Sequence, residues 1–216
     1  MRAQSTIRRL EDLGRVRLSS SFFFRDFLFS EIAGFVGIPN IPEDPSFAIE
    51  NGKMLCETLL EPLQYVFGRI AIRSGYRSRI VIDFGNKLGI GAHSLNNAAY
   101  HVWDLVDVQG RRGAGACIVL PWLADRYRDG ADWRGMAWWI HDHLPYSHLQ
   151  FFPRLCAFNI QWTETPVRRI DSYVAPIGCL TKPGMANHKT CHADSYEGFP
   201  PLVPIATPGK HRGISR

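Results

Sequence analysis

Residues 69 to 78 read Arg69-Ile70-Ala71-Ile72-Arg73-Ser74-Gly75-Tyr76-Arg77-Ser78. Ile70 and Ile72 alternate with polar or small residues, which is the period of a half-buried strand, and Gly75 closes the run. Residues 45–68, directly before it, carry an apolar stripe at helical spacing. The chain is therefore expected to pass from a buried helix into a strand, with Pro62 kinking the helix near its last turn.

Further helices and strands are expected on both sides of this unit. The apolar spacing predicts a short helix over 24–37, a weak one over 78–87 and an amphipathic one over 133–143. Short apolar or alternating runs predict strands at 101–108, 116–120, 148–152, 156–162 and 168–175. Two helices followed by strands broken by helices indicate an α+β fold, with a small, mostly antiparallel sheet flanked by helices.

Changes in composition suggest three parts. Residues 1–20 are polar and poorly periodic and are expected to form an N-terminal arm. Residues 21–176 carry the expected domain. Residues 177–216 are rich in Pro and Gly, which predicts a tail that either wraps the domain or stays disordered.

Composition limits the classes of function and partner. The chain has 216 residues, 45% of them hydrophobic, and a formal charge of +5. Its basic residues are scattered in isolated pairs rather than gathered in a stripe, so nucleic acid is not the expected partner, and DNA binding rests on charge alone. Five widely spaced cysteines, an odd number, argue against a disulfide scaffold.

The apolar stretches are short or interrupted by charges, so no membrane insertion is expected. The residues after the first ten mix Glu, Asp and Arg and do not form the apolar centre of a signal peptide. We therefore expect the protein to be cytoplasmic as synthesised and to reach a virion or a cell wall only by another route.

Several ordered segments together resemble the zinc D-Ala-D-Ala carboxypeptidases that trim cell-wall peptides. In the first half these are Phe22-Phe23-Phe24-Arg25-Asp26-Phe27-Leu28-Phe29-Ser30-Glu31-Ile32-Ala33, Asn40-Ile41-Pro42, Leu59-Leu60-Glu61-Pro62-Leu63 and residues 68–78. In the second half they are Leu144-Pro145-Tyr146-Ser147-His148-Leu149-Gln150 and Ala157-Phe158-Asn159-Ile160. The resemblance covers about Leu18 to Tyr173 and implies a D-Ala-D-Ala carboxypeptidase-like fold, also known as hedgehog-type.

In that family, zinc is held by a His and an Asp seven residues apart and by a second His on a later strand. The resemblance places Asn97, Asp104 and Asn159 at these positions, so two imidazoles are replaced by amides, which are poor zinc ligands. The family's Glu base, a few residues before the second His, has no counterpart in residues 150–156. Arg77 matches the family's arginine near the substrate, where a guanidinium can grip a peptide carboxylate.

Other histidines leave metal binding open. His93, if four residues were inserted, or His101, at a bulge, could join Asp104 as displaced zinc ligands. On a plain strand, however, residues 101 and 104 point to opposite faces. His188, Cys191 and His192 have the spacing of a metal clip, but in a Pro-rich tail we interpret them as solvated polar residues. His141, His143 and His148 are expected to be solvated or to cap a helix end, and either Trp138 or Trp139 is expected to face outward on its helix.

The resemblance and the replaced ligands together suggest a peptidase-like domain that has lost catalysis, needs no cofactor, and acts as a cell-wall-peptide binder or as a structural component. Its expected partners are a peptidoglycan peptide or another protein of an assembly, such as a phage particle. The alternative is an active zinc metallopeptidase acting on peptidoglycan stem peptides through displaced ligands.

Overall fold

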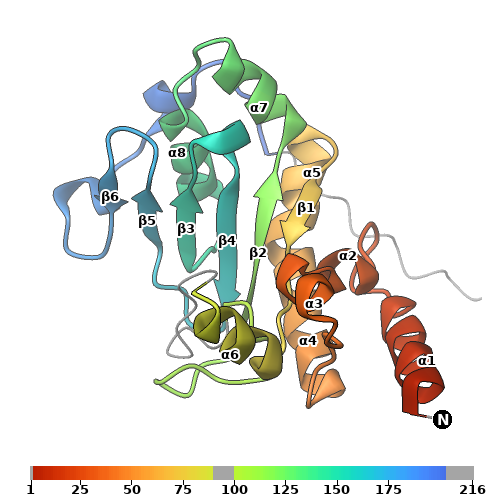
Figure 1. Ribbon diagram of the computed structural model, residues 1–216. Helices are drawn as coiled ribbons and strands as arrows, with labels where there is room; N and C mark the ends of the chain where they lie inside the picture. Colours follow the sequence, from red (N-terminus) through yellow and green to blue (C-terminus); the bar gives the residue numbers. More distant parts are fainter. Residues whose placement is uncertain (1, 90–99, 203–216) are drawn as a thin grey trace, which may run out of the picture.

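A computed structural model of the chain describes residues 2–89 and 100–202, and these form a six-stranded sheet with helices on both faces (Figure 1). The strands lie in the order β1-β2-β4-β3-β5-β6. Their bounds are β1 Ala71–Ser74, β2 Gly113–Val119, β3 His148–Phe151, β4 Phe158–Thr163, β5 Arg169–Ser172 and β6 Gly178–Thr181. No helix among the described residues is long and apolar enough to cross a membrane.

The α+β class is confirmed, but the sheet is larger than expected and mixed. Neighbouring strands are antiparallel except β3 and β5, which are parallel. The parallel pair arises because β5 reverses direction after β4 yet lies on the other side of β3, which is itself antiparallel to β4. The alternation of residue types predicts strands but not which neighbour each one chooses.

The helices before the sheet are shorter and more numerous than predicted. They are α1 Arg2–Gly14, α2 Arg25–Leu28, α3 Glu31–Val36, α4 Pro45–Leu55, the π-helical turn η1 Cys56–Leu60 and α5 Glu61–Phe67. The single helix expected over 24–37 is divided into α2 and α3, because Ser30 caps α3 by accepting a hydrogen bond from the Ala33 amide.

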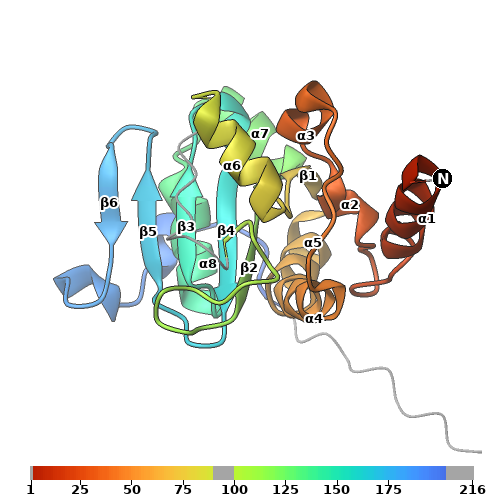
Figure 2. The same ribbon diagram turned by 60° about the horizontal axis from the view of Figure 1, so that its bottom comes forward.

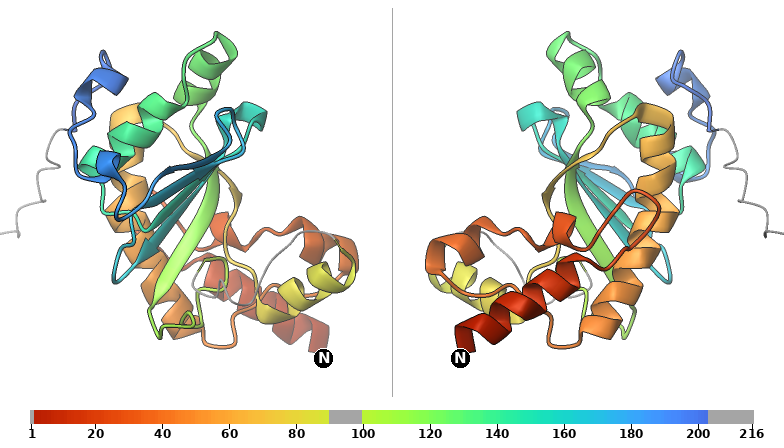
Figure 3. Two further views of the ribbon diagram at one scale, coloured as in Figure 1. Left: turned by 90° about the vertical axis from the view of Figure 1, so that its left-hand side faces the viewer. Right: turned by 90° about the vertical axis from the view of Figure 1, so that its right-hand side faces the viewer.

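One continuous helical rod runs from α4 through η1 to α5. Pro62 has no amide hydrogen to donate to the preceding turn, and the irregularity expected from it is a π-helical turn in which the Glu61 amide bonds to the Cys56 carbonyl. With α8 (Arg134–His143), this rod covers one face of the sheet (Figure 3). The main core lies between them and includes Leu59, Trp139 and Ile160.

The opposite face of the sheet carries α3 and α6 (Arg79–Lys87), which pack together (Figures 2 and 3). Between β2 and β3 the chain also forms α7 (Pro121–Arg128). Short 3-10 helices follow later, η3 Arg154–Cys156, η4 Ala186–His188 and η5 Ala193–Tyr196. The strand expected over 101–108 is absent, since these residues form bends and turns before β2.

The two terminal segments are more ordered than their composition suggests. Residues 2–14 of the expected arm form α1, which lies at the edge of the molecule beside α2 (Figure 1). Within the expected tail, β6 adds a strand to the sheet and η5 packs against α8, so the described part up to residue 202 wraps the domain. Residues 203–216 lie outside the described part.

Candidate functional site

A pocket of about 210 Å³ opens on the sheet face that α4, α5 and α8 leave uncovered. Its described lining consists of Glu31, Arg73, Ser74, Arg77, His101, Cys117, Phe152 and Asn159. Cys117 and Asn159 are direct partners across β2 and β4, and both alternate with core residues, so they face away from the helical layer. The pocket therefore brings together side chains from α3, β1, β2, β4 and three loops.

The loop that carries Arg77 is fixed by backbone contacts. β1 ends at Ser74, and Gly75 follows where a Cβ atom would come within 2.6 Å of the Phe27 Cβ, so only glycine fits this close approach. The Arg77 amide then donates to the His101 carbonyl at 2.8 Å. In the Gly-Tyr-Arg run, close packing therefore requires the glycine, and a backbone hydrogen bond fixes the position of the arginine.

The pocket gathers two guanidinium groups. Arg73 lies on the exposed edge of β1, whereas Arg77 is only 9% exposed. Burial lowers the pKa of Arg77, while Glu31 and Cys117 act in the opposite direction. Arginine stays charged in proteins, so the pocket keeps two positive groups beside the single described lining carboxylate, Glu31.

Cys117 is a neutral thiol rather than a nucleophile in this setting. Burial raises its pKa, and the nearby Arg73 and Arg77 only partly oppose this effect. Thiolate chemistry requires the reverse balance. Cys117 therefore contributes shape and polarisability to the pocket wall.

His101 lies in the pocket lining with its ring orientation set by the backbone. Its Nδ1 is 2.7 Å from the Gly75 carbonyl oxygen, to which only a protonated Nδ1 can donate. A histidine held in this way has Nε2 as its basic nitrogen, the arrangement common among metal-ligating histidines.

The Asp104 carboxylate joins two loops through hydrogen bonds. It accepts hydrogen bonds from the Glu43 amide at 2.7 Å and from the Tyr76 hydroxyl at 3.1 and 3.2 Å. Asp104 is buried and is not among the described residues that line the pocket. Burial and the Asp104 carboxylate together raise the pKa of Tyr76, which keeps this hydroxyl protonated as a donor.

The structure thus unites part of the predicted site. Arg77, His101 and Asn159 line one pocket, while Asp104 holds the loop before α4. Asn97 and His93 lie outside the described residues. Glu31, on α3, also lines the pocket, although it lies far in the sequence from residues 150–156, where the resemblance places the family's base.

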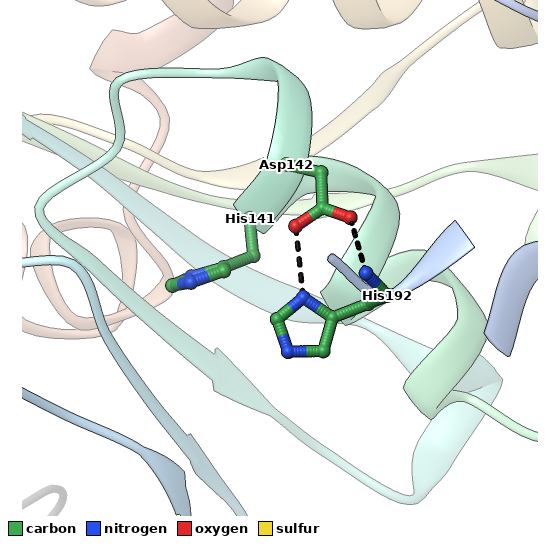
Figure 4. Close-up of side chains that lie close together, drawn as sticks. All are labelled: His141, Asp142 and His192. Carbon is green, nitrogen blue, oxygen red and sulfur yellow. Dashed lines mark hydrogen bonds and ion pairs between the residues drawn. The ribbon is translucent and has the colours of Figure 1, made fainter. Parts of the chain in front are cut away.

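A second polar cluster lies in the helical layer, where His141 and Asp142 of α8 approach His192. Among the described residues, His141, Asp142 and His192 form the one group of three possible metal ligands whose donor atoms lie within 4.8 Å of one another (Figure 4). His141 is 2% exposed, so it is not the solvated or capping residue expected from its place near a helix end.

Comparisons with known proteins give no further guidance. No family model, curated protein or solved structure matches the chain. The function must therefore be argued from the geometry of these sites.

Proposed function

We propose that the chain is a peptidase-like domain without catalysis that binds the free C-terminal carboxylate of a short peptide, of the kind found in cell-wall stem peptides. The observation that carries this proposal is the presence of Arg73 and Arg77 in one small pocket with a single described lining carboxylate. Guanidinium groups bind carboxylates through paired, charge-assisted hydrogen bonds.

The other lining groups suit the end of a peptide. The Asn159 amide has both donors and an acceptor for a peptide group, and Phe152 and Cys117 give apolar surface for a small side chain. A volume of about 210 Å³ matches one or two small residues rather than a bulky chain. This size supports an alanine-like terminus.

The test is a calorimetric titration with an acetylated peptide ending in D-Ala-D-Ala, compared with the same peptide ending in an amide. We expect the free acid to bind at least about tenfold more tightly, because the amide has no charge for the arginines. Arg73→Gln should weaken binding of the acid by a similar factor, and Arg126→Gln, on the exposed surface of α7, should leave it unchanged.

Arg77→Gln is a second test, with thermal unfolding as its fold control because this side chain is buried. Equal affinity for the acid and the amide would contradict the proposal. So would an Arg73→Gln variant that binds the acid as well as the unmodified protein does.

The alternative, an active zinc peptidase with displaced ligands, draws on His101, whose Nδ1 is held by a carbonyl. Its other ligand would be Asp104, whose Oδ2 accepts a hydrogen bond from the Glu43 amide and whose two oxygens lie near the Tyr76 hydroxyl. This alternative would be favoured over the binding domain if the unmodified protein bound zinc and cleaved the peptide, and if His101→Gln lost that zinc.

A further inference from the structure

In the C-terminal segment, meaning the described residues 177–202, His192 and Tyr196 both bond to one carboxylate of α8, that of Asp142. Asp142 accepts hydrogen bonds from His192 through both the backbone amide, at 3.0 Å, and Nδ1, at 2.8 Å (Figure 4). The Tyr196 hydroxyl donates to the same carboxylate at 3.0 Å. Two parts of the chain 50 residues apart therefore meet at a side chain that is only 16% exposed.

The imidazole rings around Asp142 are packed and oriented. The ring of His192 stacks on Trp138 with centroids 3.7 Å apart and planes within 4°, which covers a tryptophan that helical geometry alone could place toward solvent. The ring of His141 lies 5.4 Å from that of His192 and 5.1 Å from that of His188. His188 and His192 thus both lie beside His141, and His192 is hydrogen-bonded to Asp142.

Both nitrogens of the His141 ring have partners. Nδ1 lies 2.6 Å from the Tyr146 hydroxyl oxygen, and Nε2 lies 2.9 Å from the His188 carbonyl oxygen. Neutral imidazole, not imidazolium, is the ligand that zinc requires.

We propose that His141, Asp142 and His192 form a structural zinc site that fastens the C-terminal segment to α8. Two imidazoles and a carboxylate are an ordinary zinc donor set. The fourth ligand would come from His188, whose ring adjoins that of His141, or from the exposed free thiol of Cys191, next to His192. His188, Cys191 and His192 have the sequence spacing of a metal clip, and the structure adds His141 and Asp142 on α8 as further possible ligands.

Zinc requires only local changes at this place. A metal would replace the proton that His192 Nδ1 shares with Asp142, with each ligand atom about 2.0–2.2 Å from the ion. His141 would exchange its Nε2 hydrogen bond to the His188 carbonyl, now 2.9 Å long, for the metal bond. Its Nδ1 would keep Tyr146, whose hydroxyl lies 2.6 Å away and supplies the usual outer support of a ligating imidazole.

The experiment measures metal directly in the full-length chain, produced without a polyhistidine tag and purified without added metal. Elemental analysis should find about one zinc per chain, and a chelator should remove it. Restoring free zinc to about a hundredfold above the dissociation constant should raise the melting temperature by roughly 5–10 °C. His192→Gln and Asp142→Asn should lose the zinc and this shift.

The matched control is His143→Gln, on the same helix but with its Nδ1 bonded to the Trp139 carbonyl. It should retain zinc. Cobalt substitution then tests the cysteine as the fourth ligand. A thiolate charge-transfer band that disappears in Cys191→Ser assigns it to the cysteine, and absence of the band from the outset rules the cysteine out.

Two results would overturn this site. One is unmodified protein that neither contains zinc nor gains thermal stability from it, a measurement that stands even if a variant fails to fold. The other is zinc that survives in His192→Gln but disappears in His101→Gln, which would move the metal to the arginine pocket. Failure of peptide binding in Arg73→Gln leaves this proposal unaffected, since Arg73 lies on β1.

Discussion

The side-chain amide of Asn40 fixes the loop that carries Arg77. Its Nδ2 donates to the carbonyls of Leu28 and Tyr76 at 3.0 and 2.8 Å, and its Oδ1 accepts from the Ser78 amide at 2.7 Å. The side chain is buried, so these groups have no access to water in its place. Asn40 therefore fixes the backbone on both sides of Arg77 without lining the pocket.

We expect Asn40→Ala to lower the free energy of unfolding by about 3 kcal/mol, because buried backbone groups would lose their partners. Urea unfolding measures the effect. Gln109→Ala, in an exposed turn, is the control and should change stability by less than about 0.5 kcal/mol. A near-neutral Asn40→Ala variant would show that water replaces the amide.

Asp171 on β5 should make stability depend on pH. Burial raises its pKa, but hydrogen bonds from His148, at 2.7 Å, and from Arg169 outweigh burial and hold the pKa well below its usual range. A carboxylate whose pKa is depressed by folding contributes stability above its unfolded pKa of about 3.9, and this contribution is lost as the pH falls toward the folded value.

Asp171→Asn should therefore cost about 1–2 kcal/mol at pH 7, and the difference from the unmodified protein should shrink below about pH 4. Urea midpoints at several pH values measure this difference, with the exposed Asp194→Asn as control. A gap between the two proteins that stays constant down to the lowest pH would mean that Asp171 contributes by packing rather than by charge.

Sequence reasoning could place residues on strands and in loops, but not decide what they contact. Asn159 follows from its alternation with Phe158 and Ile160, and Arg77 from the run that ends in it. The contacts of Asp104 could not be predicted, because its partners, the Glu43 amide and the Tyr76 hydroxyl, depend on where two distant loops meet.

At the scale of elements, the C-terminal segment behaves as part of the core rather than as a tail. Phe199 packs against Trp122 and Phe67 with centroids 4.9 and 6.1 Å away, and the Trp139 indole donates to the Pro200 carbonyl at 3.1 Å. The Pro and Gly content of this stretch predicts an irregular backbone, and the backbone is irregular. Composition does not predict, however, that such a stretch also buries aromatic side chains.

Phe199→Ala should lower the free energy of unfolding by about 2 kcal/mol, somewhat less than a fully buried aromatic ring, because Phe199 is only partly buried. Guanidinium unfolding monitored by the fluorescence of the six tryptophans measures the unfolding midpoint. Tyr65→Ala, 59% exposed on α5, serves as the control. If both variants unfold at the same midpoint, the segment contributes no packing energy.

The strongest patterns predicted elements best. The helices at 45–68 and 133–143 follow from long apolar stripes, and β4 from strict alternation. The false strand at 101–108 had apolar Val102 and Leu105 among polar residues, but Trp103 turns into the core and its indole donates to the Gly115 carbonyl. Tertiary burial of one large side chain overrode the local pattern.

In the whole molecule, one face of the sheet contributes to the main core and the other carries the pocket. One face packs on α4, α5 and α8 and holds most of the buried apolar side chains. The other face carries the pocket that contains Arg73 and Arg77. On the helical side, His192 bonds to Asp142 and so joins the described C-terminal segment to α8. A ligand entering the pocket therefore meets polar side chains that the main core does not need for its own packing.

This arrangement predicts that the unmodified protein binds D-Ala-D-Ala peptides without hydrolysing them. Hydrolysis by a zinc peptidase needs a metal with an open position and a base beside the bound water. Glu31 could serve as a base, but among the described residues of the pocket His101 is the one imidazole, and Asp104 is not one of them. We expect no enzymatic release of D-alanine in a coupled assay, with or without added zinc. Release that a chelator abolishes, and that both His101→Gln and Glu31→Gln remove, would instead establish a peptidase whose ligands have moved.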